Sequence, residues 1–467
     1  MMSHHHHLTR RKFIGQASCA ALGSTTLLST LTNLKFINAA SIANSSILGG
    51  GDYKAMVCIL LSGGSDSHNM LIPKDQNRYN DYANTRGAIS IPRDEVRSLN
   101  NTDFGVHPSM SGIQQLFNDN KLSFISNIGT LLQPMVKDEV WQNEQLLPLG
   151  LFSHSDQTQQ WQTSLPNSRS NIGFGGKLAD LMSSLNTNDK ISMNVSLSGS
   201  NIFQTGESSV EYSIDPVDGS IGIEGYSATS NDSFDAARRD AIDNLVDANY
   251  TDIYRKTYID VIKNSRDANI EFTEAIGSTP FLRDMFSNND FSESLHMIAK
   301  TIAARDTLGM KRQIFFVDLG GWDHHDELLN SQAELLNILN AGMTEFNAAL
   351  ERLNIQDCVT TFTASEFGRT LTWNGNGTDH AWAGNVMVMG GPVVGGRIFG
   401  DTPSLELGSG YELGGGGVML PTLSVDEYFA ELALWFGVSP SELNTILPNI
   451  GNFYNTGSGN MPIGFLG

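Results

Sequence analysis

The chain contains few cysteines and few basic residues, and each shortage excludes classes of function. Its 467 residues include three cysteines, Cys19, Cys58 and Cys358, with no C-x-x-C motif, which excludes a cysteine-rich zinc site. Cys58 and Cys358 lie in apolar runs, so we expect buried free thiols there rather than a disulfide. The 29 lysines and arginines are outnumbered by 50 aspartates and glutamates, for a formal net charge of -21. Because nucleic acids and anionic membranes attract basic surfaces, neither is expected as a partner.

Long uninterrupted hydrophobic runs are also missing, so no permanent membrane span is expected. The most apolar stretch near the N-terminus is broken by GSTT at residues 23–26. It follows the twin-arginine sequence TRRKFI at residues 9–14 and precedes the small residues AAS at 39–41. This order is typical of a twin-arginine export leader with its cleavage region. We predict that residues 1–45 are a leader and that the rest of the chain acts in the periplasm or outside the cell.

Apolar runs of strand length recur along the chain and end in polar side chains. Continuous runs of this kind are typical of strands buried on both faces of a sheet. A segment with the apolar face of a helix, residues 328–352, separates two of them. The runs are YKAMVCILLS before Asp66, QIFFVDL before Asp323 and His325, and CVTTFT before Glu366. The pattern predicts an open α/β sheet.

The polar side chains after these runs are candidates for one metal site, because ligands bind at the carboxyl ends of strands in open α/β sheets. The Asn- and Gly-rich loop after the last run adds Asp379 and His380. Mixed carboxylate and imidazole sets suit zinc, manganese, magnesium or calcium, and one or two such ions would stabilise an anionic ester. For a single carboxylate such as Asp66, the competing interpretation is a helix cap. The predicted metal ligands are Asp66, Asp323, His325, Glu366, Asp379 and His380.

A further candidate lies in LFSHSD at residues 151–156, where a polar helix is expected to begin. Backbone N–H groups and the helix dipole at that point would stabilise an anion or an alkoxide. Ser153 therefore has two interpretations, a reacting hydroxyl or an ordinary helix N-cap. The residues alone leave both open.

Residues 189–307 carry few side chains suited to chemistry. Residues 189–228 are rich in serine and glycine and predict short strands and turns, whereas residues 232–307 have a helical pattern. We expect the region to be a loop and helical insertion in the fold or a cover over it. His296 within it is expected to be a surface or core histidine.

Several motifs, taken in chain order, resemble a known family. They are TRRKFIG, LSGGSDSHNMLIP, FSHSDQTQQWQT, FVDLGGWDHHDEL, TASEFGRTLTWNGNGTDHAWAGNVMVMGG and LPTLSVDEYFAELALWFGVSPSELNTILPNI. They are similar to the exported bacterial proteins grouped as domain of unknown function 1501, in the alkaline phosphatase-like superfamily beside sulfatases and phosphodiesterases. The resemblance implies that residues 46–467 form a single three-layer α/β/α sandwich around a central mixed, mostly parallel sheet. It also implies a metal-dependent hydrolase site, although the family has no settled activity.

The resemblance implies roles for particular residues. Ser153 would be the nucleophile with His154 beside it, because a Ser, Thr or modified Cys opens a helix at this point in relatives. Asn69 and Arg369 are expected to bind the substrate. Phe367 stands where the superfamily has a histidine ligand, which argues against a complete two-metal site. No Cys-x-Pro-x-Arg motif is present, which disfavours a formylglycine sulfatase.

These observations favour an exported metal-dependent hydrolase of phosphate or sulfate esters. The expected substrate is a small anionic ester or a sulfated or phosphorylated glycan. The alternative is a non-catalytic exported protein of the same fold that binds a glycan or another cell-surface partner, because a fold does not by itself confer an activity. A redox enzyme exported with its cofactor is disfavoured, because no G-x-G-x-x-G motif follows the first strand.

Overall fold

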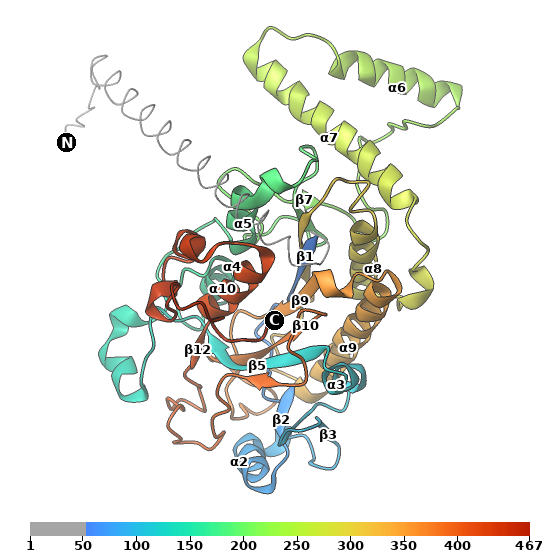
Figure 1. Ribbon diagram of the computed structural model, residues 1–467. Helices are drawn as coiled ribbons and strands as arrows, with labels where there is room; N and C mark the ends of the chain where they lie inside the picture. Colours follow the sequence, from blue (N-terminus) through green and yellow to red (C-terminus); the bar gives the residue numbers. More distant parts are fainter. Residues whose placement is uncertain (1–52) are drawn as a thin grey trace, which may run out of the picture. The chain divides into compact units, whose positions relative to one another are not determined.

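The computed structural model describes residues 53–467, which lie in one compact unit beginning at Gly51. The predicted leader, residues 1–45, lies outside the described residues. A nine-stranded sheet runs through the centre of the described chain (Figure 1). Its strands are β1 (Lys54–Leu60), β5 (Leu122–Gly129), β6 (Asn194–Ser196), β7 (Tyr212–Ser213), β8 (Arg312–Asp318), β9 (Val359–Ala364), β10 (Gly384–Met389), β11 (Ile398–Phe399) and β12 (Leu423–Ser424).

The strand order brings the ends of three strands together. The order is β11-β5-β10-β9-β1-β8-β6-β7, with β12 also paired to β5. β10 is antiparallel to β5 and β9, and the other pairings in this sheet are parallel. Ile59 of β1 is in register with Val317 of β8 and Thr363 of β9, so the carboxyl ends of β8, β1 and β9 meet at one edge. The mixed, mostly parallel sheet predicted from the sequence is confirmed.

Helices cover both faces of the sheet, which gives three layers (Figure 1). Successive side chains of a buried strand face opposite layers. Val57 and Ile59 pack in the core with residues of the first helix layer, whereas the rings of Phe316 and Phe362 lie 5.9 and 6.2 Å from that of Phe203 on the other side. The first layer contains α3 (Ser111–Asn118), α7 (Ile253–Gly277), α8 (Asp290–Ala303) and α9 (Leu328–Arg352), and the second contains α4 (His154–Thr163), α5 (Phe174–Met182) and α10 (Val425–Phe436).

A small antiparallel sheet accompanies the central one and packs near α2 (Gln76–Arg86). Its strands are β2 (Leu71–Pro73), β3 (Arg97–Ser98) and β4 (Phe104–Val106). Two further helices are α6 (Ser233–Val246) and α11 (Leu443–Ile446). α2 packs over the turn that follows β1, and for this reason it affects the site.

Residues 189–307 differ from the insertion or cover that we expected. β6 pairs with β8 in the central sheet, and α8 packs against α9. Leu295, Ile298 and Ile302 of α8 belong to the main core, because their helical spacing places them on one face. The largely exposed part of the region is α6 with the first turns of α7.

Most helices begin where the sequence predicts. α9 spans Leu328–Arg352 as expected, and α10 begins with a capping box at Ser424. α3 begins at Ser111, after a turn in which His107 Nδ1 accepts a hydrogen bond from the Ser109 N–H at 3.1 Å.

Two composition-based expectations also concern the described residues. Cys58 and Cys358 are free thiols, as predicted, with Cys58 buried and Cys358 partly buried. Within residues 53–467, no helix combines the length and the apolar character that crossing a bilayer requires.

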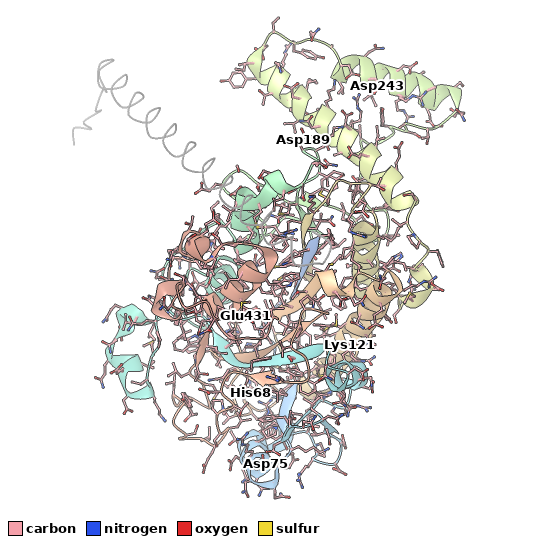
Figure 2. The ribbon with its side chains drawn as sticks, in the orientation of Figure 1. His68, Asp75, Lys121, Asp189, Asp243 and Glu431 are labelled. Atoms are coloured by element: carbon pink, nitrogen blue, oxygen red, sulfur yellow. The ribbon has the colours of Figure 1, made fainter. Side chains whose placement is uncertain are left out.

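The C-terminal segment is held on α10 by a buried carboxylate. Glu431, labelled in Figure 2, accepts hydrogen bonds from the backbone N–H groups of Ile463, Gly464 and Leu466, each at 2.7 Å. One side chain therefore satisfies three backbone donors that burial would otherwise leave without partners.

A partly buried lysine fixes the end of the helix that begins with His154. Lys177 of α5 donates to the carbonyl oxygens of Thr163, the last residue of α4, at 3.1 Å and of Ile446 at 3.0 Å. Burial lowers the pKa of Lys177 to about 8, although the nearby Asp426 opposes this. Burial also raises the pKa of Asp426 to about 7, against the opposing charge of Lys177.

Replacing Asp426 with Asn should change how stability depends on pH. The folded-state pKa of Asp426 is raised, so its stabilising contribution is complete below the unfolded-state pKa of about 4 and is lost as pH rises toward 7. Asp426→Asn should therefore gain stability relative to the parent between pH 4 and pH 8, by about 1–4 kcal/mol. Denaturant unfolding at both pH values measures this difference, and an unchanged difference would contradict the burial argument.

Candidate metal site

Three loops at the carboxyl ends of β1, β8 and β9 form the candidate site. The loop after β1 packs so closely that side chains would not fit at its glycines: a Cβ at Gly63 would lie 2.4 Å from the Asp323 nitrogen, and one at Gly64 would lie 2.1 Å from the Phe367 ring. Both glycines also have positive φ angles, 120° and 80°, which glycine adopts without strain. The Gly63 N–H donates to Glu366 Oε1 at 2.8 Å. The three loops therefore pack backbone to backbone.

Arg369 ties these loops together. Its fully buried guanidinium donates to the carbonyl oxygens of Gly64 at 2.7 Å and Thr378 at 3.0 Å. It also forms an ion pair with Asp323, and its Nη1 lies 3.5 Å from His325 Nε2. We expected Arg369 to bind substrate, but its donors are occupied by the protein, so in this structure it positions the loops.

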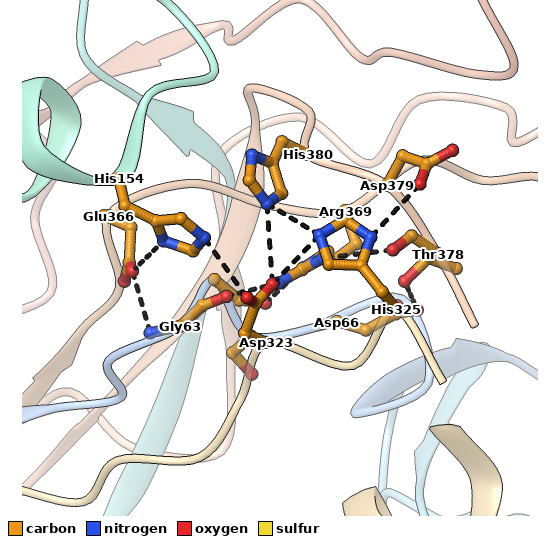
Figure 3. A network of polar contacts seen from close by, with 12 residues as sticks. Gly63, Asp66, His154, Asp323, His325, Glu366, Arg369, Thr378, Asp379 and His380 are labelled. Atoms are coloured by element: carbon orange, nitrogen blue, oxygen red, sulfur yellow. Dashed lines mark hydrogen bonds and ion pairs between the residues drawn. The ribbon is translucent and has the colours of Figure 1, made fainter. Parts of the chain in front are cut away.

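Three histidines surround the carboxylate of Asp323 (Figure 3). The Nε2 atoms of His325 and His380 lie 3.1 and 3.5 Å from Asp323 Oδ1. His154 Nε2 lies 3.5 Å from Oδ2. The Nε2 atoms of His325 and His380 are 2.9 Å apart, and His154, Asp323 and His380 offer ligand atoms within 4.8 Å of one another. Three histidines, from α4 and two loops, therefore lie around the carboxylate of Asp323, two of them near Oδ1 and one near Oδ2.

A polar partner at Nδ1 fixes the orientation of each of these histidine rings. The partners are Glu366 Oε1 for His154 at 2.9 Å, Asp379 Oδ1 for His325 at 3.2 Å, and the carbonyl oxygen of Phe152 for His380 at 2.8 Å. Carboxylate and carbonyl oxygens accept hydrogen bonds, so these contacts favour a proton on each Nδ1. With that proton on Nδ1, each Nε2 has a lone pair directed toward Asp323. Metal-binding histidines usually have the same arrangement, in which the other ring nitrogen donates to a carboxylate or a carbonyl.

The contact between His325 and His380 requires a cation. Two nitrogen lone pairs 2.9 Å apart repel each other unless a proton or a metal ion lies between or beside them. Burial lowers the pKa of His380, and the charge of Arg369 lowers it further, against the opposing bond to Phe152. A neutral imidazole is the form that binds metal, so the lowered pKa suits His380 to a metal ion rather than a stored proton.

Asp323 supplies the negative charge in this cluster. Burial acts to raise its pKa, but the bond and charge of Arg369, with smaller contributions from His325 and His154, hold the pKa below its ordinary value. The side chains of Asp323 and His325 are 48% and 43% exposed. The cluster is therefore ionised and open to solvent on one side.

Phe367 closes another side of the cluster. Its buried ring lies with its centroid 4.6 Å from that of His380 and 4.9 Å from that of His154. A phenyl ring has no donor atom for a metal. Phe367 therefore packs against two of the histidines at the position where the resemblance led us to expect another ligand.

The six predicted metal ligands have three different environments. Asp323, His325 and His380 converge on one point. Glu366 and Asp379 contact the Nδ1 atoms of His154 and His325, on the side of each ring away from Asp323. Asp66 lies outside the cluster.

Ser153 and His154 are adjacent in the sequence but have different surroundings. His154 faces Asp323, whereas Ser153 is the N-cap of α4, with its Oγ 3.5 Å from the Asp156 nitrogen and 3.2 Å from Ser155 Oγ. Ser153 therefore caps α4, and this contact keeps its hydroxyl at the helix N-terminus without excluding the nucleophile interpretation. The sequence did not reveal that His154 lies beside Asp323, because the direction of its side chain depends on how α4 packs.

Asp66 and Asn69 are directed into the core. Asp66 forms a fully buried ion pair with Arg86 of α2 at 2.5 Å. Burial raises the pKa of Asp66, but Arg86 outweighs this and lowers it. Asn69 is also fully buried, donates to the carbonyl of Ile89 and accepts from the Tyr82 hydroxyl. These positions differ from the expected roles of metal ligand and substrate contact, because α2 packs over the turn after β1.

Sequence reasoning assigned no role to Arg86 or to the carbonyl group of Phe152. Arg86 lies in the last turn of α2, where a basic residue is ordinary in a surface helix, and only its burial shows the ion pair. Phe152 has a positive φ of 74°, which is uncommon for a residue other than glycine. No sequence pattern marks a backbone carbonyl as a histidine partner.

Comparison with known proteins places the chain in a family but assigns it no activity. Among solved structures, Ps i-CgsB in complex with k-i-k-neocarrahexaose has 13% identity, a TM-score of 0.32, and coverage of 82% of this chain and 72% of that chain. The PsFucS1 sulfatase from Pseudoalteromonas sp. has 10% identity, a TM-score of 0.35, and coverage of 87% and 72%. A mutant of alkaline phosphatase PafA has 11% identity, a TM-score of 0.26, and coverage of 69% and 64%.

At TM-scores below 0.5, these structures assign neither a substrate nor a catalytic residue to this chain. No curated protein matches it. The family model described as "Protein of unknown function (DUF1501)" matches residues 53–412, which include β1, β8, β9 and all four converging side chains. The chain therefore belongs to the family of unknown function DUF1501.

Proposed function

We propose that this protein binds a divalent metal ion through His154, Asp323, His325 and His380 and hydrolyses phosphate or sulfate esters there. The observation that carries the proposal is the convergence of three histidine Nε2 atoms on one carboxylate, with two of these atoms 2.9 Å apart. The donor set fits a metal, because each ring is held in the tautomer that leaves Nε2 free. We propose one ion, since Phe367 supplies no donor and Asp66 is paired with Arg86.

The donor set favours zinc among the four ions expected from the sequence. Three imidazole nitrogens and one carboxylate are common zinc ligands, and a zinc ion held by all four would take an ester oxygen as a fifth ligand, an expansion seen in catalytic zinc sites. Magnesium and calcium prefer sites made of oxygen atoms, and manganese favours carboxylate, carbonyl and water ligands. Zinc is therefore our proposed resident ion.

The residues around the cluster have distinct tasks in the proposed hydrolysis. A bound divalent ion would supply a Lewis acid for the oxygens of an anionic ester. Glu366 and Asp379 keep the histidine rings oriented, and Arg369 keeps Asp323 ionised and fixed in place. The exposed side of the cluster admits an ester from solvent. Because the chain has a net charge of -21 and repels anions, the positive charge of a bound ion would be needed to attract the ester.

Ser153 is our proposed nucleophile. It immediately precedes His154 and lies at the start of α4, where backbone N–H groups stabilise negative charge. The resemblance to the alkaline phosphatase-like superfamily supports the same assignment, with an ester of phosphoric or sulfuric acid as substrate. A protein that retains metal but hydrolyses no ester would instead support a binding role for the same site.

Removing a converging histidine should remove the metal. The purified protein should hold one equivalent of zinc, and His325→Ala or His380→Ala should hold less than about a tenth of it, because each loses a direct ligand. Elemental mass spectrometry of the parent and the variants measures this. Equal metal content in parent and variants would contradict the site.

Two variants serve as controls for that experiment. Asp66→Asn should keep the metal although it lowers stability by about 3–5 kcal/mol, because it leaves the buried Arg86 without its full partner. His296→Gln, in α8 and outside the cluster, should also keep the metal. Loss of metal from a folded Asp66→Asn protein would restore Asp66 as a ligand and contradict our assignment.

Removing the Ser153 hydroxyl should abolish turnover and leave the metal in place. We expect Ser153→Ala to reduce ester hydrolysis by roughly 10³-fold or more, the scale seen when a covalent nucleophile is removed. Ser155→Ala, two residues away on the same helix, should retain activity. The assay measures the release of phosphate and sulfate from a panel of monoesters and diesters, and full activity in Ser153→Ala would rule out Ser153 as the nucleophile.

A further inference from the structure

A cavity of about 380 Å³ lies beside the candidate metal site. Its wall includes Trp373, which is 46% exposed, and Leu329, which is 38% exposed. An indole ring left half exposed keeps a large apolar face in contact with water, at a cost in free energy. Nothing in the metal cluster or the proposed hydrolysis uses this ring.

The polar residues of the cavity are amides and one carboxylate. Asn330, Asn376 and Glu327 line it, and no lysine, arginine or histidine does so among the described residues. Side-chain amides both donate and accept hydrogen bonds, and the carboxylate accepts them. A wall with one flat apolar face, neutral amides and a single negative charge is unsuited to an anionic group. It fits a neutral ring that has an apolar C–H face and a rim of hydroxyl groups.

Two chain segments, 323–330 and 373–380, contribute to both the cavity and the metal cluster; Ala88 and Ile89 complete the cavity, and His154 completes the cluster. Asn376 is three residues from Asp379, so their Cα atoms lie within about 11 Å, and Glu327 is two residues from His325, within about 8 Å. The Asn374 amide, next to Trp373 in the chain, donates to Asp379 Oδ1 at 3.0 Å. A ligand that fills the cavity therefore lies close to the metal-binding histidines.

The segments that join cavity and cluster are also held rigidly together. The Leu328 N–H donates to the Asn376 carbonyl at 3.3 Å, and the Thr378 N–H donates to the His324 carbonyl at 3.0 Å. A Cβ at Gly377 would lie 2.2 Å from the carbonyl oxygen of His324, so the two backbones are in direct contact. The distance between cavity and cluster is thus fixed by the fold.

We propose that this cavity is a carbohydrate subsite in which Trp373 stacks against a neutral sugar ring of the substrate. Asn330, Asn376 and Glu327 would bond the hydroxyl groups of that ring. The binding of the sugar ring does not depend on the proposed function. The proposed function enters in the next step, in which the ester group on a neighbouring sugar would reach the metal cluster. The substrate class is then a glycan that bears a phosphate or sulfate ester, with an uncharged residue next to the charged one.

Neutral oligosaccharides test the subsite separately from the metal. The full chain, treated with a chelator, is titrated calorimetrically with neutral hexasaccharides of glucose, galactose, mannose and N-acetylglucosamine. We expect at least one of them to bind, and we expect Trp373→Ala to weaken its association constant by about tenfold or more, as loss of aromatic stacking does for ring ligands. Trp373→Phe should recover part of the binding, because a phenyl face still supports stacking.

A matched control uses a second exposed aromatic residue. Tyr411 is 38% exposed and lines a different cavity of about 520 Å³ with Phe453, and Tyr411→Ala should bind as the parent does. The proposal is overturned if no hexasaccharide binds the parent, if Trp373→Ala binds as tightly as the parent, or if Trp373→Phe is as weak as Trp373→Ala. If the protein as purified, before chelation, holds no metal, sugar binding would reject the proposed function and leave the subsite standing, whereas metal in the purified protein without sugar binding would do the reverse.

Discussion

The buried guanidinium of Arg369 is the interaction on which the geometry of the site depends. It bonds to the loops after β1 and β9 and pairs with Asp323 on the loop after β8. A buried arginine is stable only when its donors have partners, and here the loop carbonyls and one carboxylate supply them. The same contacts hold Asp323 ionised at the centre of three histidines. Arg369 therefore couples the stability of the loops to the position of the proposed metal ligand.

The surroundings of the cluster determine how many cations it can accommodate. On one side Phe367 packs its ring against His154 and His380. Farther along the same edge, Arg86 already neutralises Asp66 in a pair from which solvent is excluded. A carboxylate paired in this way offers little to an incoming ion, since the ion would have to displace the guanidinium. The proposed site therefore accommodates one divalent cation, because the guanidinium of Arg86 occupies the position beside Asp66 that a second ion would need.

The sheet, the central helices and the region of the site were predictable from the sequence, but the role of each side chain was not. Buried strands such as 53–62 and the apolar face of 328–352 are local patterns, and strand ends in an α/β sheet lie at one edge by geometry. Asp323 contacts the Nε2 atoms of the histidines, whereas Glu366 contacts the Nδ1 atom of His154. This difference depends on the direction of each side chain after the three loops have packed. No local pattern encodes that direction.

Long-range packing accounts for the remaining differences. Asp66 pairs with Arg86 only because α2 folds over the turn after β1. His154 joins the cluster only because α4 lies across the carboxyl end of β9 and is held at its far end by Lys177. Residues 189–307 contribute β6 and α8 to the core because the spacing of their apolar residues matches distant partners. Val195, for example, lies beside Phe315, more than a hundred positions away in the sequence. These facts belong to the assembled fold rather than to any segment of the sequence.

Anomalous X-ray scattering from crystals of the protein grown with zinc tests the central claim most directly. The account predicts a single anomalous peak, bonded to the Nε2 atoms of His154, His325 and His380 and to the carboxylate of Asp323, with Arg86 still paired to Asp66. Two peaks, or one peak bonded to Asp66 with the three histidines uninvolved, would contradict it.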